Sequence, residues 1–192
     1  MIAGHFGFAA IVKSREQRVP LWSLMLATAW LDVLFVPLFM MKIETLTPVP
    51  GLSGGYGQNF IYADYTHSLL GALALSALFG LIVAPLWGRR CAIVLGLVSF
   101  SHWSIDLIFH RRDMPILPGN LGNLTRLGFS LWQFKTVSIL FELLLVVFGA
   151  WCYWRAASRI TNTAQTGRTA AVTTAILILL SGIAVLALDV KQ

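Results

Sequence analysis

The segment that decides the fold is "CAIVLGLVSFSHWSIDLIFH", residues Cys91–His110. As a helix it is long enough to cross the hydrocarbon core of a bilayer, which takes about 20 mostly apolar residues. It nevertheless carries His102, Asp106 and His110, each four residues after the one before. Residues four apart lie on one face of a helix, so these side chains should form a polar stripe along a membrane helix.

The rest of the chain has the composition of a membrane protein. Hydrophobic residues make up 57% of its 192 residues, charged residues only 11%, and the mean hydropathy is +0.77. A soluble domain carries roughly 25% charged residues. We therefore predict an integral membrane protein, folded as one domain over residues 1–192.

Other apolar segments of similar length flank the first one. The five predicted spans are Leu21–Met41, Thr66–Trp87, Cys91–Phe109, Leu131–Trp154 and Ala170–Asp189. A shorter apolar segment, Ile2–Val12, precedes them, and we expect it to form a re-entrant or interfacial helix because it is too short to cross. The predicted fold class is all-α: a polytopic membrane helical bundle with about five transmembrane helices plus this short N-terminal helix.

The basic residues predict how the chain is oriented. The net charge is +6, but the Lys and Arg residues are scattered at the ends of the predicted spans, so we expect no nucleic-acid partner. One predicted side carries Lys13, Arg15, Arg18, Arg89, Arg90, Arg155, Arg159 and Arg168. The other carries Lys42, Arg111, Arg112, Arg126 and Lys191. Because positive charge favours the cytoplasmic side, the turn Lys13–Pro20 should be cytoplasmic and the loops Lys42–Tyr65 and Arg111–Ser130 should lie outside.

Several ionisable residues fall where lipid is expected. Asp32, His102 and Glu142 lie near the middle of three predicted spans, and His67 begins another. Placing such a group at mid-bilayer costs roughly 2.5–3.5 kcal/mol, so each of them needs a partner or a function.

Antiparallel packing would gather these residues into one column. The turn near Gly88 should set His67 level with His110. If Ile2–Val12 folds back into the membrane, His5 should lie level with Asp32. The column then runs from His5, Asp32, His102 and Glu142 outward to His67, Asp106 and His110.

A metal site is the interpretation that uses all of these residues together. A His and a carboxylate one helical turn apart can bind the same ion, and imidazole with carboxylate suits zinc. A single membrane histidine is more often a hydrogen-bonding helix contact, but that explanation must be repeated for each of the four histidines. A proton or ion pathway remains an alternative.

The same residues carry a resemblance to a known family. "GH" at Gly4–His5, Asp32, "THSLL" at Thr66–Leu70, and His102 followed by Asp106 resemble the LexA-binding, inner-membrane-associated metal-dependent hydrolases of bacteria. The match covers about residues 1–119. That family is in turn similar to the helical zinc-dependent phospholipase C fold, in which His and Asp residues on several helices bind zinc ions that activate water.

The resemblance implies a set of ligands and a reaction. By position, His5, Asp32, His67, His102 and Asp106 would bind one to three zinc ions, with His110 and Glu142 as further ligands. The family often has His-Arg-Gly ahead of "THS" where this chain has "YAD", so Asp64 would replace the missing ligand or base. Asp32 and Asp64 are the candidate catalytic residues.

Three functions follow from this site. The first is a hydrolase of the bacterial cytoplasmic membrane that cleaves a phosphoester, such as that of a membrane lipid, in a site that opens toward the outer face. The second is a proton or metal-ion conductor. The third is a non-catalytic subunit of an oligomer or larger membrane complex. A conductor should open on both faces, whereas a hydrolase should have a pocket open on one side.

Overall fold

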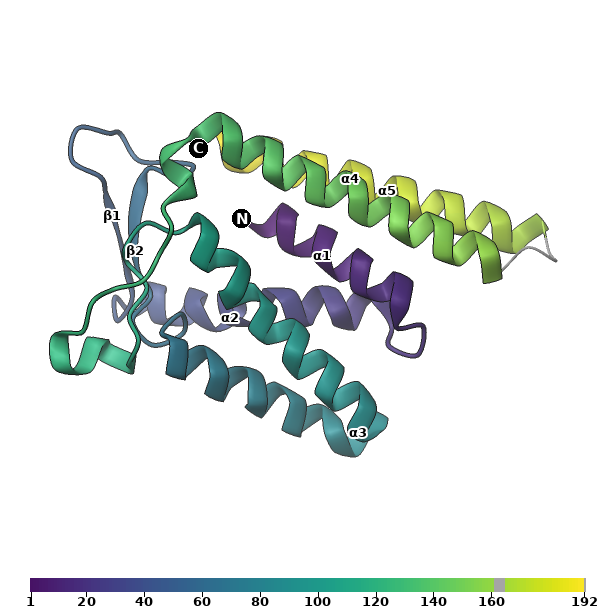
Figure 1. Ribbon diagram of the computed structural model, residues 1–192, viewed down its shortest axis with the longest axis horizontal. Coiled ribbons are helices and arrows are strands. Elements are labelled where there is room, and N and C mark those ends of the chain that lie inside the picture. Colours follow the sequence, from purple (N-terminus) through teal and green to yellow (C-terminus); the bar gives the residue numbers. More distant parts are fainter. Residues whose placement is uncertain (161–164, 192) are drawn as a thin grey trace.

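The computed structural model describes residues 1–160 and 165–191, and most of them are helical (Figure 1). The elements in order are α1 (Ile2–Arg15), α2 (Leu21–Met40), β1 (Thr45–Pro48), β2 (Asn59–Tyr62), α3 (Leu69–Phe109), η1 (Pro118–Asn123), η2 (Leu131–Gln133), α4 (Lys135–Ile160) and α5 (Gln165–Lys191). Four helices in the described part are long and apolar enough to cross a membrane: Leu21–Met40, Leu69–Phe109, Lys135–Ile160 and Gly167–Lys191. The prediction of a mostly α-helical fold with apolar helices of membrane length is confirmed.

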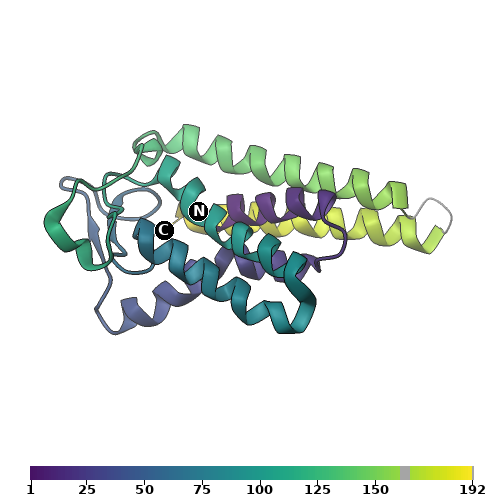
Figure 2. The same cartoon turned by 60° about the horizontal axis from the view of Figure 1, so that its bottom comes forward.

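Helix α3 accounts for the difference from the five predicted spans. The two spans expected on either side of Gly88 form one element of 41 residues, so the described chain has four candidate spans. Gly88 lies within it at φ 80° and ψ 167°, a conformation that residues with a Cβ rarely adopt. The helix therefore bends sharply there, and its two arms run back beside each other (Figures 1 and 2).

Small residues let the two arms of α3 approach closely. A Cβ added to Gly80 would lie 2.9 Å from the carbonyl oxygen of Ala92 on the other arm. The hydroxyls of Ser76 and Ser99 are 3.0 Å apart across the same contact. Close backbone packing through small residues and hydroxyls is the usual way in which helices associate in lipid.

The short helix α1 lies inside the bundle, in contact with α2, α4 and α5 (Figure 1). Its buried residues are Ala3, Gly4, His5, Gly7, Ala9 and Ala10. A Cβ on Gly149 of α4 would collide with the backbone of Gly7, so the two helix backbones touch. The expected N-terminal helix is thus covered by protein on several sides, and His5 points into the interior.

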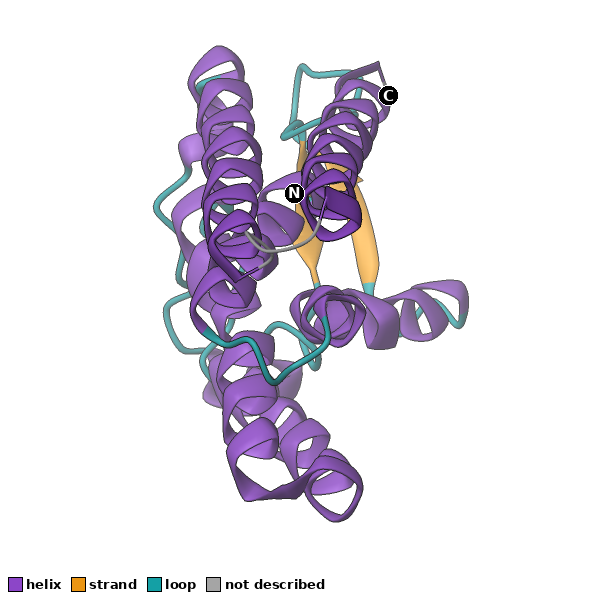
Figure 3. Cartoon of the chain, turned by 90° about the vertical axis from the view of Figure 1, so that its right-hand side faces the viewer, coloured by secondary structure: helices purple, strands orange, loops and turns teal. Residues whose placement is uncertain are grey.

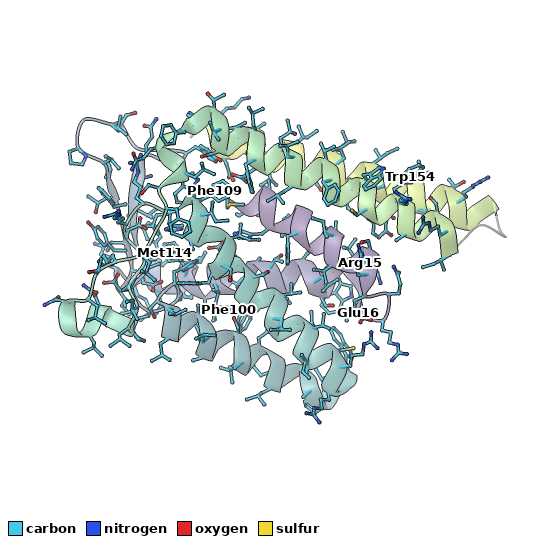
Figure 4. All side chains as sticks on the ribbon, in the orientation of Figure 1. Arg15, Glu16, Phe100, Phe109, Met114 and Trp154 are labelled. Carbon is cyan, nitrogen blue, oxygen red and sulfur yellow. The ribbon has the colours of Figure 1, made fainter. Side chains whose placement is uncertain are left out.

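Loops and a small sheet cover one end of the bundle (Figure 1), and Figure 3, which looks from the opposite end, shows the two strands behind the helices. Strands β1 and β2 pair in antiparallel fashion, with Thr45 opposite Tyr62. The sequence predicted a loop over Lys42–Tyr65, in which Pro and Gly forbid a regular helix, and the structure places two four-residue strands within it. We call the end of the bundle that carries these loops and strands the loop end. Phe109 and Met114 lie toward it, whereas Arg15, Glu16 and Trp154 lie toward the opposite end, the basic end (Figure 4).

Candidate metal centre

The structure brings four imidazoles to one buried carboxylate. Oδ1 of Asp106 lies 3.0 Å from Nε2 of His5. Oδ2 of Asp106 lies 3.1 Å from Nε2 of His102, 3.5 Å from that of His110 and 3.7 Å from that of His67. All five side chains are at most 4% exposed. We call this set, together with Asp32, the His–Asp cluster.

Asp32 of α2 completes the cluster. Its Oδ1 lies 3.5 Å from Nε2 of His67 and 3.6 Å from Nε2 of His102. Two groups of three possible ligands result, His5–His102–Asp106 and Asp32–His67–His102, and the ligand atoms within each group lie within 4.8 Å of one another. These buried groups are arranged so that they could hold a metal ion.

Three of the six members of the cluster, His102, Asp106 and His110, come from one stretch of sequence in which they are four residues apart. His102 and Asp106 lie on the second arm of α3, and both face the interior. His110 is the residue after the helix, but its N–H still bonds to the carbonyl of Asp106 at 2.7 Å, so it continues the same stripe. His67 stands just before the first arm of α3 begins. The bend at Gly88 turns the chain around, so the end of the second arm, with Asp106 and His110, returns to the level of His67.

The ring of His102 has a defined tautomer. Its Nδ1 contacts the backbone carbonyl of Thr28 on α2. A carbonyl only accepts hydrogen bonds, so Nδ1 carries the hydrogen. In the neutral ring, Nε2 therefore presents a lone pair to the cluster, as a metal-binding histidine requires.

The ring of His67 is fixed in the same way, through a hydroxyl. Its Nδ1 lies 2.8 Å from Oγ1 of Thr66, and that hydroxyl lies 2.9 Å from Oε2 of Glu44. The Thr66 hydroxyl has one hydrogen, which it donates to the acceptor-only Glu44 carboxylate, so it must accept from His67 Nδ1. Glu44 also accepts the backbone N–H groups of Tyr65 and Thr66, both at 2.8 Å. Nε2 of His67 is thereby left with a lone pair.

His110 has a carboxylate behind it. Its Nδ1 donates to Oδ1 of Asp113 at 3.0 Å, while Oδ2 of Asp113 accepts the N–H of Ile61 on β2 at 2.8 Å. Burial opposes a charge on His110, but its hydrogen bonds to the Asp106 and Asp113 carboxylates outweigh this effect and raise its pKa to about 9. The loop end is thus tied directly to the orientation of this ring.

The two anchored rings face each other. Nε2 of His67 and Nε2 of His102 are 3.1 Å apart. When both rings are neutral, both Nδ1 atoms hold the hydrogens, and two lone pairs meet with no hydrogen between them. This contact is repulsive unless a cation, either a proton or a metal ion, is shared between the nitrogens.

His5 differs from the other three rings. It stacks on His102 with the ring centroids 3.9 Å apart. Its Nδ1 is buried and has no hydrogen-bond partner in the described part of the chain. No neighbour therefore fixes its tautomer, and in the neutral ring Nε2–H can donate to Asp106.

The cluster opens through Asp32. The Asp32 side chain is 33% exposed, far more than any other member of the cluster. It lines a cavity of about 540 Å³ at the loop end, together with Phe35, Tyr56, Trp132 and Asp189. A molecule in this cavity would therefore meet the cluster at Asp32 first.

Two predicted site residues have other partners. Asp64 forms a two-point ion pair with Arg126, at 2.6 and 2.9 Å, which ties two loops together. Glu142 accepts the hydroxyl of Tyr56 at 2.6 Å and the N–H of Gly4 at 3.2 Å. The structure does not bring either carboxylate into the groups that could hold a metal ion.

Sequence reasoning also missed the residues that orient the rings. Thr66 precedes a predicted ligand, and its place in "THS" was the only signal for it. Glu44 and Asp113 come from the loops and reach the cluster only through tertiary contacts. Thr28 contributes a backbone carbonyl, for which no side-chain pattern exists.

Comparison with protein-family models, with curated proteins and with solved structures gives no match to this chain. The resemblance to the bacterial membrane hydrolases therefore stays a prediction.

Proposed function

We propose that this chain is a membrane-embedded, zinc-dependent hydrolase that cleaves a phosphoester, most simply that of a membrane lipid. The observation that carries the proposal is the pair of anchored imidazoles, whose Nε2 atoms face each other at 3.1 Å. A divalent cation bound by these nitrogens and the adjacent carboxylates removes the repulsion. Imidazole and carboxylate together suit zinc among the common divalent metals.

The chain supports a ligand set of His67, His102, Asp32 and Asp106, with His110 and His5 beside it. Bound zinc would lower the pKa of a coordinated water to about 7 and polarise a phosphoryl oxygen. Thr28 and Thr66 hold His102 and His67 in the tautomer that leaves Nε2 free for the metal, and Asp113 orients the ring of His110. In most metal sites, the histidine ligands donate their other ring N–H to a group of this kind.

Asp32 is the residue that would meet the substrate. It is the exposed carboxylate of the cluster and lines the cavity at the loop end. There it is placed to bind the metal or to accept a proton from the attacking water. The apolar side chains of Phe35 and Trp132 in the same cavity suit the glycerol and upper acyl portion of a lipid.

The membrane placement is part of the proposal. Each arm of α3 would cross the bilayer, so that the chain crosses five times and α1 enters part-way. The turn Lys13–Pro20 would face the cytoplasm of a bacterium, and the loop end with its cavity would face outward. The basic residues at one end support this orientation.

Metal content and hydrolysis, measured on one set of variants, test the proposal. Asp106→Asn keeps the shape of the side chain but removes the charge next to four imidazoles, and it should lower both bound zinc and hydrolysis of a fluorescent phospholipid by tenfold or more. Asp64→Asn is the matched control, because Asp64 pairs with Arg126 and should leave zinc content unchanged. Wild type purified without chelators should contain zinc by elemental analysis.

Two results would count against the function in different ways. If wild type holds no metal, and Asp106→Asn is no less stable, the cluster is a buried hydrogen-bond column. If zinc is bound but no phosphoester is cleaved, the metal site stands and the catalytic role fails. A conductor or a structural subunit would then be the better explanation.

A further inference from the structure

The basic end, where Figure 4 labels Arg15, carries a group of basic side chains of its own. A cavity of about 420 Å³ lies between the last turn of α1 and the C-terminal part of α4. Three arginines line it: Arg15 from α1, and Arg155 and Arg159 from α4. We call it the arginine pocket.

The sequence places these charges on one side of α4. Arg155 and Arg159 are four residues apart and therefore share a helix face, on which Trp151 also lies. The guanidinium of Arg155 sits over the Trp151 ring, 5.3 Å from its centroid. This cation–π contact places the guanidinium next to Trp151, which lines the pocket as well.

Within residues 1–160 and 165–191, no carboxylate forms an ion pair with these three arginines. In the part of the chain that the structure describes, the arginine ion pairs are Arg90 with Glu16 and Arg126 with Asp64. Glu16 follows Arg15 directly, but its Oε2 accepts from Arg90 Nη2 at 2.7 Å and from Nε at 3.0 Å. The nearest acid in the sequence is therefore bonded to α3, and the pocket keeps its full positive charge.

The surroundings of the pocket fit a lipid. Phe148 and Trp151 line it and are 51% and 44% exposed, although they belong to a helix of membrane length. The arginines follow them toward the C-terminal end of that helix, which is the depth of the headgroups for a crossing helix. Basic pockets between helices at the cytoplasmic face are a recognised form of headgroup site.

We propose that the arginine pocket binds the phosphate of an anionic glycerophospholipid, whose acyl chains lie along Phe148 and Trp151. The guanidinium groups donate to the phosphate oxygens, as arginine does to phosphate elsewhere. A free phosphate or phosphorylated solute shares this chemistry, but it would leave the exposed aromatic side chains beneath the pocket uncovered. The site does not depend on the proposed hydrolase function, because it lies at the other end of the fold.

Lipid binding to the full-length protein in detergent micelles tests the proposal. Fluorescent phosphatidylglycerol is titrated in dodecyl maltoside, with phosphatidylcholine and inorganic phosphate as the other two arms. Wild type should bind phosphatidylglycerol at least tenfold more tightly than phosphatidylcholine, and phosphate should not compete. Arg155→Gln/Arg159→Gln should lose about 25-fold in affinity, since each basic residue near a headgroup contributes about fivefold.

The control removes the same charge elsewhere. Arg18→Gln/Arg168→Gln changes two exposed arginines that do not line the pocket, and it should keep the affinity within about threefold of wild type. Equal losses in both double variants would show general surface attraction and overturn the site. Competition by inorganic phosphate would overturn the lipid assignment. If the pocket double variant does not fold, Arg159→Gln alone should still lose about fivefold, and unchanged binding would refute the proposal.

Discussion

Replacing Thr66 by Val tests how the cluster holds a cation. Valine keeps the shape and the β-branched backbone preference of threonine, but it cannot accept from Nδ1 of His67, now 2.8 Å from the hydroxyl. Without metal, His67 can move its hydrogen to Nε2 and avoid an orphaned donor. Metal binding to Nε2 forces the hydrogen back to Nδ1, where a buried unpaired N–H costs about 1–3 kcal/mol.

The cost therefore falls on the metal-bound state. This cost corresponds to a loss of about 5- to 150-fold in zinc affinity. That range includes the 10- to 100-fold loss typical when a residue that hydrogen-bonds to a metal ligand is removed. Stability without metal should change less, because Glu44 keeps the backbone N–H groups of Tyr65 and Thr66. Zinc affinity is measured in detergent by competition with a chromophoric chelator, and thermal unfolding is followed in parallel.

Thr28→Val is the matched control for this experiment. It also removes a buried hydroxyl beside the cluster, one that donates to the carbonyl of Met25 at 2.8 Å. It leaves in place the backbone carbonyl that accepts from His102. Zinc affinity should therefore stay near that of wild type. The tautomer argument is refuted if Thr66→Val binds zinc as wild type does, or if both variants lose affinity equally.

Three further outcomes are expected. Gly149→Val should destabilise the protein by about 1–3 kcal/mol or more, because its side chain would collide with the backbone of Gly7, and a thermal unfolding midpoint equal to that of wild type would contradict the contact. Hydrogen bonds from Arg90 and a backbone N–H lower the pKa of Glu16 from its ordinary value of 4.5, so the pair stabilises the folded state above that pH and the effect is lost as the pH falls below it. Arg90→Gln should thus unfold at a lower temperature than wild type at pH 7, by a small amount because Arg90 is exposed. The difference should vanish near pH 3, and a difference that persists there would show another cause. A cysteine at Ser53 should react with an impermeant reagent in intact cells, and labelling only after permeabilisation would reverse the proposed orientation.

Depth along the helices could be predicted from the sequence. The spacing of His102, Asp106 and His110 defines one helix face, and the structure places all three at the cluster. Counting residues from the turns set His5 level with Asp32, and both now lie within reach of His102. Such arguments succeed because a helix rises by a constant amount per residue.

Rotation about each helix axis could not be predicted in the same way. Glu142 is fully buried and faces α1, but it accepts the N–H of Gly4 and the hydroxyl of Tyr56 instead of joining the metal-ligand groups, because packing and not depth decides which groups a side chain meets. Asp64 lies on an irregular segment, where no period constrains its direction, and it pairs with Arg126. Glu44 orients His67 from a loop whose course only tertiary contacts define.

The position of α1 has a consequence for how this protein is made. Gly4 bonds to Glu142, so the first helix is completed by a partner that is synthesised 138 residues later. Until α4 has been inserted, α1 lacks much of the protein cover that a segment too short to cross requires. Helix α1 therefore reaches its final contacts only once α4 is in place, and the His–Asp cluster is complete only when assembly is.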